Sequence, residues 1–259
     1  MILRTIDMMT LIAIPAMKDN YIWVLSNLQR ESIIIDPGIA RPVLDYLTKN
    51  NITPKTILLT HHHNDHVGGV YDILEQYPNI PVYGPLETLN KGCTSPVLAN
   101  DKIIALDIIF QVLYVPGHTL GHLAYYAVPY LFCGDALFSA GCGRILEGTP
   151  QQMYSSLQII ARLPNNTLIC CAHEYTESNL RFARFVLSKN KSIQEYQRKV
   201  RTLRFQNQPT LPSSLKLEKD INPFLRCHDN DLELNISCSN RPDSAWKIFA
   251  LLREMKDLF

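Results

Sequence analysis

The sequence lacks both an excess of charge and a long hydrophobic run. Its 25 Lys and Arg residues balance 24 Asp and Glu residues, for a formal net charge of +1. A chain this close to neutrality lacks the positive potential with which proteins bind nucleic acids through their phosphates. No apolar stretch approaches the roughly 20 residues that a membrane-spanning helix needs. We therefore expect neither a nucleic-acid nor a membrane partner, and the 46% hydrophobic content predicts a globular protein with a full-sized core.

Cysteine is present, but without the spacing of a disulfide framework or of a Cys-x-x-Cys zinc motif. The count of seven is odd, which also argues against a fully paired set. Reduced thiols in a cytoplasmic enzyme are the simplest interpretation, and most of these side chains are predicted to be small core residues. Cys142 is the exception, because it lies in a loop that we place near the candidate site. The cysteines are Cys93, Cys133, Cys142, Cys170, Cys171, Cys227 and Cys238.

The N-terminus has a short apolar segment but lacks the other features of a signal peptide. Met8–Met17 is mostly apolar. Asp7, the break at Pro15 and the missing small-residue cleavage site argue against a cleaved leader. We predict instead that residues 11–14 form the first core strand. Met9 is an alternative natural start, which would leave the residues before it dispensable.

Apolar periodicity divides the chain into a strand-rich part and a helical part. Up to about residue 175, short strand-like segments dominate and helical segments fall between groups of them. Beyond about residue 177 the spacing is helical, and no internal repeat or low-complexity linker interrupts the chain. We predict a catalytic domain over residues 1–175 and a helical C-terminal domain over 176–259. The predicted strands are 11–14, 21–25, 32–35, 56–60, 80–83, 108–115, 122–128, 130–133 and 167–171, and the predicted helices are 41–50, 66–77, 150–162, 179–189, 192–206 and 243–255.

One stretch directly after a strand-like segment is dense in metal-binding side chains. It contains His61, His63, Asp65 and His66. Imidazole and carboxylate are the ligands that zinc and similar divalent ions prefer. His61 and His63 are two residues apart, so in an extended chain their side chains leave from the same side. The stretch lies inside the chain, between a strand pattern and a helix pattern, so a terminal tag does not explain it. We predict a metal site here.

Three further strand ends each carry a candidate ligand. His118 lies in a glycine-flanked turn after one predicted strand, Asp135 follows a second and His173 follows a third. A lone histidine is more often a hydrogen-bonded structural residue than a ligand. Together with the four residues of the dense stretch, however, these three make seven ligands, the number for two ions that share a bridge.

These motifs resemble those of the metallo-β-lactamase superfamily. The segments that carry the resemblance are Thr60-His61-x-His63-x-Asp65-His66, Gly117-His118, Gly134-Asp135 and His173. The resemblance implies an α/β (α+β) fold, in which an αββα sandwich holds metals at one edge of its two sheets and is followed here by a small helical domain. This motif is specific for the fold but does not by itself identify the reaction.

Later motifs resemble one family within that superfamily, glyoxalase II (hydroxyacylglutathione hydrolase), and the likeness covers nearly the whole chain. They are Ala16-x-x-Asp19-Asn20-Tyr21, Gly141-Cys142-Gly143-Arg144, Glu147-Gly148-Thr149, His173-Glu174-Tyr175-Thr176, Asn222-Pro223-Phe224 and Arg253-x-x-Lys256-Asp257. Together with the helical domain, these motifs specify the family more closely than the metal ligands do.

The resemblance to glyoxalase II implies two divalent metal ions. Zinc is the expected metal, and iron and manganese accept the same mixed nitrogen and oxygen ligands. By this resemblance the first ion is held by His61, His63 and His118, the second by Asp65, His66 and His173, and Asp135 bridges them together with a water or hydroxide. Asp65 and Asp135 thereby act as catalytic residues. Two ions lower the pKa of a shared water toward neutrality, so no protein nucleophile is required.

The implied reaction is the hydrolysis of S-D-lactoylglutathione to D-lactate and glutathione, the second step of methylglyoxal detoxification. By the resemblance, glutathione is bound by Arg144, Tyr175, Arg253 and Lys256. Position 146 departs from the family, because Leu146 lacks the hydroxyl of the tyrosine found there. The lost hydrogen bond predicts weaker glutathione binding, by about 0.5–1.5 kcal/mol. A monomer is expected, with the small thioester as its only partner.

Four alternatives remain at this stage. A persulfide dioxygenase shares the His-x-His-x-Asp-His motif but uses one iron, and the basic C-terminal motif favours the thioesterase. Lactone or β-lactam hydrolysis fits the cytoplasmic composition less well. RNA processing by this fold is disfavoured by the near-neutral charge. A structural or metal-buffering role leaves Asp135 unexplained. His62, His122 and His228 are interpreted as structural or surface residues, and Glu174 as a packing or outer carboxylate.

Overall fold

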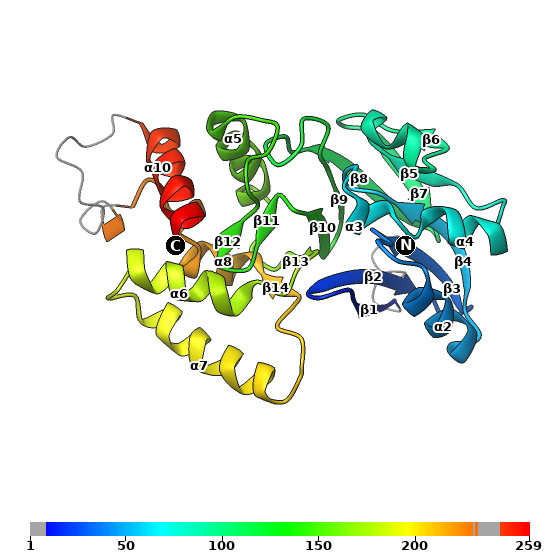
Figure 1. Ribbon diagram of the computed structural model, residues 1–259, viewed down its shortest axis with the longest axis horizontal. Helices are drawn as coiled ribbons and strands as arrows, with labels where there is room; N and C mark the ends of the chain where they lie inside the picture. The colour runs from blue at the N-terminus through cyan, green and yellow to red at the C-terminus, as the bar shows by residue number, and fades with distance from the viewer. Residues whose placement is uncertain (1–8, 230, 233–243) are drawn as a thin grey trace. The chain divides into compact units, whose positions relative to one another are not determined.

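The computed structural model describes residues 9–229, 231, 232 and 244–259 (Figure 1). The chain forms two compact units. One comprises the chain up to Tyr114 together with Gly121–Gly134, and the other comprises Val115–Leu120 together with the chain from Asp135 onward. The alternative start at Met9 concerns the first eight residues, which lie outside the described part, as does Cys238.

The first unit contains a six-stranded sheet in the order β1-β2-β3-β4-β5-β6. The first three strands are antiparallel neighbours, and from β3 onward the neighbours are parallel. The strands are β1 (Thr10–Ala16), β2 (Asn20–Ser26), β3 (Glu31–Ile35), β4 (Thr53–Leu58), β5 (Val82–Gly84) and β6 (Ser95–Pro96). All seven residues of β2 are buried, which is typical of a strand covered on both faces. The predicted first strand over 11–14 is confirmed by β1.

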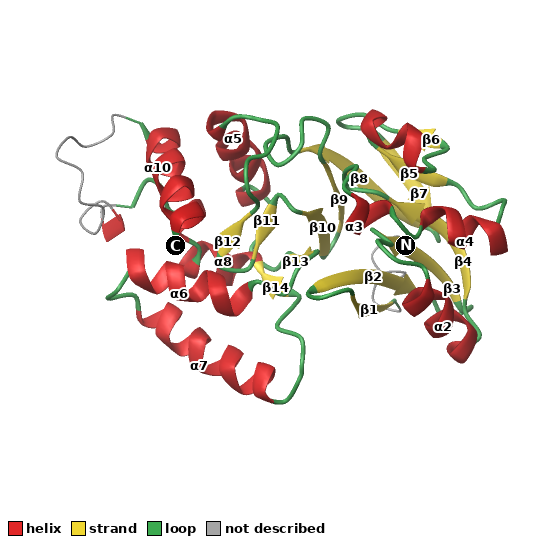
Figure 2. Ribbon diagram, viewed as in Figure 1, coloured by secondary structure: helices red, strands yellow, loops and turns green. Residues whose placement is uncertain are grey.

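Helices cover one face of this sheet (Figure 2). They are α2 (Arg41–Asn50), α3 (Asn64–Val67) and α4 (Val70–Gln76), and the short 3-10 helix η1 (Leu86–Lys91) follows β5. Val43, Val70 and Ile73 from these helices share a hydrophobic cluster with Ile22 and Val24 of β2. The helix predicted over 66–77 is in fact interrupted, because the chain leaves helical structure at Gly68 and Gly69 between α3 and α4.

A second, antiparallel group of strands packs against the other face of the six-stranded sheet within this unit. Its order is β10-β9-β8-β7, with β7 (Lys102–Ala105), β8 (Ile108–Tyr114), β9 (Leu123–Ala127) and β10 (Tyr130–Gly134). The Trp23 ring of β2 meets the Phe132 ring of β10 edge-on at 6.4 Å between centroids, and Phe110 of β8 lies 6.4 Å from Phe132. The unit is therefore layered as helices, sheet and sheet, with the ligand-bearing loop after β4.

The second unit is mainly helical. Its helices are α5 (Pro150–Ala161), α6 (Thr176–Val186), α7 (Lys191–Phe205), α8 (Leu215–Ile221), the 3-10 helix η2 (Pro223–Leu225) and α10 (Ala245–Leu258), and its strands are β11 (Leu137–Phe138), β12 (Gly141–Cys142), β13 (Leu168–Cys171) and β14 (Ser213–Ser214). The predicted start of α5 is confirmed, because Thr149 and Gln152 form a reciprocal capping box and Pro150 takes the first turn.

A buried carboxylate holds the β11–β12 hairpin in the second unit. Glu218 of α8 accepts hydrogen bonds from the Ser139 hydroxyl and the Ala140 amide, both at 2.7 Å. Asn222 donates to the carbonyls of Phe138 at 3.1 Å and Gly141 at 2.9 Å. Ala140 has a left-handed backbone, with φ 57°, which a non-glycine residue adopts only when its surroundings fix it. The hairpin between Asp135 and Cys142 is thus anchored at its turn.

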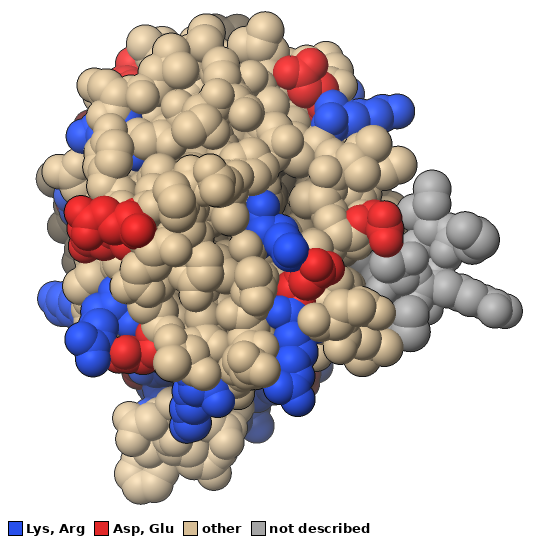
Figure 3. All heavy atoms as spheres, turned by 90° about the vertical axis from the view of Figure 1, so that its right-hand side faces the viewer, with Lys and Arg blue, Asp and Glu red and all other residues tan. Residues whose placement is uncertain are grey.

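Three properties of the molecule concern membrane-spanning helices, surface charge and disulfides. No helix in the described residues is long and apolar enough to cross a membrane. Basic and acidic side chains lie interspersed on the face shown in Figure 3, as expected for a formal net charge of +1. No disulfide joins cysteines within the described part of the chain.

Candidate metal centre

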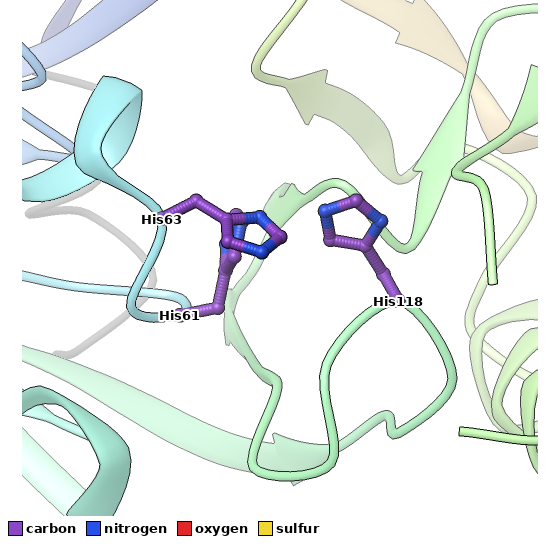
Figure 4. Close-up of side chains that lie close together, drawn as sticks. All are labelled: His61, His63 and His118. Atoms are coloured by element: carbon purple, nitrogen blue, oxygen red, sulfur yellow. The ribbon is translucent and has the colours of Figure 1, made fainter. Parts of the chain in front are cut away.

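The loop after β4 brings four predicted ligands of the first unit together. His61 Nε2 lies 3.0 Å from His63 Nδ1, the rings of His61 and His66 are 4.0 Å apart, and His66 Nε2 is 3.5 Å from Asp65 Oδ2. His61 and His66 are fully buried. Figure 4 shows the His61 and His63 side chains leaving the chain after β4, and His118 on the turn after β8.

Asp36 fixes the orientation of this loop from the end of β3. Its carboxylate accepts from the Thr60 amide at 2.8 Å and the Thr60 hydroxyl at 2.7 Å, and lies 3.0 Å from His66 Nδ1. A proton on His66 Nδ1 that bonds Asp36 leaves Nε2 with its lone pair available for a metal. Sequence reasoning missed Asp36, because nothing local shows that its partners lie 24 and 30 residues away.

Close backbone packing and two polar side chains complete the support in this unit. A Cβ on Gly38 would lie 1.8 Å from the Asp65 carbonyl oxygen, so only glycine permits this approach. The Asn20 amide donates to Asp65 Oδ2 at 3.0 Å. The Tyr125 hydroxyl donates to the Leu59 carbonyl at 2.6 Å, and burial raises the pKa of this phenol well above its usual value. It therefore stays a donor.

In the second unit the remaining three predicted ligands meet. Asp135 Oδ2 lies 3.3 Å from His118 Nε2, and Asp135 Oδ1 lies 3.4 Å from His173 Nε2. His118 Nδ1 is 2.8 Å from the Arg144 carbonyl, so Nδ1 carries the proton and Nε2 is left with its lone pair. The His173 ring stacks on Tyr175 at 4.7 Å and 6°. All three ligand side chains are buried.

The donor sets of both units fit divalent metal ions. Ligand atoms about 2.1 Å from a tetrahedrally coordinated zinc lie about 3.4 Å from one another. The separations from Asp135 to His118 and His173, at 3.3 and 3.4 Å, match that spacing better than they match hydrogen bonds. Neutral imidazoles and carboxylates are also the chemical types that zinc, iron and manganese bind.

Three of the four predicted glutathione-binding residues are exposed or half-buried. Arg144 is exposed, with Nε 3.6 Å from Asp257 Oδ1. Lys256 is half-buried over the Phe182 ring at 5.6 Å, and burial, assisted by neighbouring arginines, lowers the pKa of its ammonium group. Tyr175 is half-buried beside His173. Leu146 is exposed on the loop before α5.

Arg253 has a different environment, because it is only 6% exposed. Its Nη1 donates to the Cys142 carbonyl at 2.9 Å and lies 3.5 Å from the Gly143 carbonyl, and Nη2 donates to Asp257 at 2.8 Å. The guanidinium also lies over the Phe224 ring at 5.3 Å. The position of Arg253 therefore holds the loop that supplies the Arg144 carbonyl to His118.

Cys142 was predicted to lie in a loop, but it belongs to the short strand β12 and is buried like a core thiol. Burial raises the pKa of the thiol to about 11, although Arg253 nearby partly opposes this. The group therefore stays protonated near neutral pH, which disfavours it as a nucleophile.

Three residues interpreted as structural or surface residues have different surroundings. Glu174 accepts from the Thr210 amide at 2.9 Å and the Thr210 hydroxyl at 2.6 Å, so it ties down the segment before β14. His122 is fully buried and its ring stacks on His61 at 4.7 Å and 18°. His228 lies 2.7 Å from the Tyr154 hydroxyl.

Comparison with known proteins places this chain in one class. The model of the metallo-beta-lactamase superfamily matches residues 20–92 and 102–173. The chain therefore belongs to that superfamily, as its motifs predicted. The model described as the hydroxyacylglutathione hydrolase C-terminus matches residues 174–259. Hydroxyacylglutathione hydrolase from Edwardsiella ictaluri is 60% identical over 97% of this chain and 100% of its own length. The chain belongs to the hydroxyacylglutathione hydrolase family.

A second relative agrees with this assignment, and solved structures share the fold. Hydroxyacylglutathione hydrolase from Yersinia pestis is 55% identical over 97% of this chain and all of its own length. The crystal structure of the B3 metallo-beta-lactamase BLEG-1 is 25% identical, covers 83% of this chain and 99% of its own, and superposes with a TM-score of 0.63. ETHE1 from Myxococcus xanthus, 22% identical over 96% of this chain and 99% of its own, has a TM-score of 0.61 and shares the fold.

Proposed function

We propose that this protein hydrolyses S-D-lactoylglutathione and related 2-hydroxyacyl glutathione thioesters to the free hydroxy acid and glutathione. The observation that carries the proposal is the 60% identity to a hydroxyacylglutathione hydrolase over the whole length of that relative. A glutathione persulfide dioxygenase of the same fold is the alternative, and the family model that matches residues 174–259 favours the thioesterase.

We propose two divalent ions at the site. The first set of ligands is His61, His63 and His118, the second is Asp65, His66 and His173, and Asp135 is shared between them. The spacing around Asp135, at 3.3 and 3.4 Å, supports its bridging role. When bound, such ions lower the pKa of a water and polarise a thioester carbonyl. Zinc is the proposed metal, and metal analysis of the purified protein tests the choice against iron and manganese.

Residues around the site fix which nitrogen of each ligand histidine carries the proton. Asp36 fixes the proton on Nδ1 of His66, and the Arg144 carbonyl does the same for His118, so the Nε2 atoms stay available. Asn20 orients the Asp65 carboxylate. The leaving group is a thiolate, whose conjugate thiol has a pKa of about 8.5, so its departure needs no strong general acid from the protein.

Glutathione recognition is proposed for the basic face around α10. Arg144 and Lys256 supply positive charge for the carboxylates of the tripeptide, and Tyr175 lies beside the ligand His173. Arg253 contributes by holding the Cys142–Gly143 carbonyls that shape the loop. We propose the functional division predicted from the sequence, with residues 1–175 catalytic and 176–259 substrate-binding, and a cytoplasmic location. Cell fractionation tests the location.

The ligand assignment is tested with His63→Ala and Asp135→Ala, and with His228→Ala as a matched control away from the ligands. The first two are expected to lose bound metal and thioesterase activity together, while the control keeps both. Near-normal activity and metal content in either ligand variant would refute the assignment. If the protein consumes oxygen with glutathione persulfide and does not hydrolyse the thioester, the dioxygenase is the better assignment.

A further inference from the structure

A carboxylate outside the predicted ligand set joins two backbone segments of the first unit. Glu87, on η1, accepts a hydrogen bond from the His62 amide at Oε1, at 3.3 Å. Its other oxygen, Oε2, accepts from the Gly121 amide at 2.6 Å. The two amides lie 25 and 34 residues from Glu87 in sequence. One side chain therefore fixes the distance between the loop after β4 and the segment that enters β9.

These two segments carry a stacked pair of histidine rings. His62 lies between the proposed ligands His61 and His63, and Gly121 immediately precedes His122. The His61 and His122 rings stack at 4.7 Å and 18°, and both residues are fully buried. By holding both amides, Glu87 holds the backbone on each side of the stack and so limits the tilt of the His61 ring.

A carboxylate suits this position better than any other side chain. Two backbone N–H groups point at one group, and an ionised carboxylate has two acceptor oxygens and no donor. The amide of glutamine would accept from one N–H and direct its own N–H₂ at the other. The fit also involves Gly121, because a Cβ there would lie 2.2 Å from Glu87 Oε2.

The helix that carries Glu87 is itself fixed. The buried Thr88 hydroxyl donates to the Pro85 carbonyl at 2.7 Å. Lys91, at the other end of η1, donates from Nζ to Asn64 Oδ1 at 3.1 Å, at the start of α3. η1 is thus attached to the ligand loop at two positions that flank His63, through Glu87 at His62 and through Lys91 at Asn64.

We propose that Glu87 is a positioning residue that holds His61 and His63 in the geometry of the first metal site. The inference rests on the proposed function, since it needs the two-ion site. It predicts that loss of the carboxylate weakens the binding of one ion of the two, and that excess metal restores turnover.

The test measures zinc affinity by competition with a chromophoric chelator in wild type, Glu87→Ala, Glu87→Gln and Gly121→Ala. Glu75→Ala, an exposed glutamate of α4, is the matched control. We expect the three variants to bind one of two zinc ions about 10- to 100-fold more weakly, while the control binds both as wild type does. Gly121→Ala displaces the carboxylate but keeps its charge, whereas Glu87→Gln removes the charge. If both variants weaken zinc binding to the same extent, the position of the carboxylate matters and its charge alone does not. Added zinc is expected to restore kcat.

The outcomes are distinguishable. If the folded variants bind both ions with wild-type affinity, the positioning role is overturned. If Glu87→Ala does not fold, the zinc affinities of Glu87→Gln and Gly121→Ala are compared with that of the control, and wild-type affinity in both variants likewise overturns the positioning role. Variants that are less stable but bind zinc normally would show that Glu87 only supports the fold. A wild-type protein that binds no metal would overturn the proposed function instead.

Discussion

Replacement of Asp36 by Asn tests how the protein prepares His66 for a metal. The carboxylate is buried, and its Oδ2 atom serves both the Thr60 hydroxyl at 2.7 Å and His66 Nδ1 at 3.0 Å. In Asp36→Asn the amide oxygen can keep the bond from the Thr60 amide, and the N–H₂ group replaces Oδ2. The threonine hydroxyl can rotate to accept, but His66 can accept only by moving its proton to Nε2, the proposed ligand atom.

The expected losses of stability and of metal affinity follow from these contacts. Loss of one hydrogen bond to a buried charged group costs about 1.5–3 kcal/mol of unfolding free energy. A change of an outer partner of a ligating histidine weakens metal binding by about 10- to 100-fold. Asp36 has φ 51°, which asparagine tolerates, so the variant adds no backbone strain. Asp36→Ala, by contrast, combines the lost bonds with that strain and is expected to be less stable.

The assay has two parts. Urea unfolding of metal-free protein measures the stability loss, and zinc competition measures the affinity. Asp72→Asn, at an exposed position of α4, is the control. If Asp36→Asn unfolds like the control and binds zinc like wild type, the hydrogen bonds to Asp36 do not orient His66 as argued.

Three further variants test other parts of the account. Cys142→Ala is expected to leave kcat unchanged, because burial raises the pKa of this thiol to about 11; a large fall in kcat would implicate the sulfur. Burial raises the pKa of Glu218 above its usual 4.5, so its contribution to folding is present below pH 4.5 and is lost as pH rises through the folded-state pKa. Glu218→Gln lacks this pH dependence, so its unfolding free energy relative to wild type should rise across that pH window. Urea titrations at a series of pH values measure this difference, and a difference that does not change with pH would refute the raised pKa of Glu218. Leu146→Tyr should lower KM for glutathione thioesters roughly two- to tenfold, and an unchanged KM would mean that this loop does not reach the substrate.

The candidate metal ligands stand out in the sequence because each lies in a local pattern. His61 and His63 follow an apolar strand at a spacing of two, and Asp135 directly follows β10. Strand ends and histidine spacing are properties of neighbouring residues, so one sequence is enough to reveal them. The short apolar segments predicted the core strands for the same reason.

The supporting residues could not be predicted because their partners are distant in sequence. Glu87 and Gly121 are 34 positions apart, and Arg253 and Cys142 are 111 positions apart. Arg253 near the end of a helix has the same sequence pattern whether it is exposed to a ligand or buried under a loop. The β11–β12 hairpin has strands of two residues each, too short for any periodicity to show.

The most direct test of the central claim is the hydrolysis of S-D-lactoylglutathione by the purified full chain, followed by loss of thioester absorbance. It is run as purified, after treatment with a metal chelator, and after zinc is added back. The account predicts fast hydrolysis that the chelator abolishes and zinc restores. Absence of hydrolysis in a protein shown to carry two metal ions would contradict it.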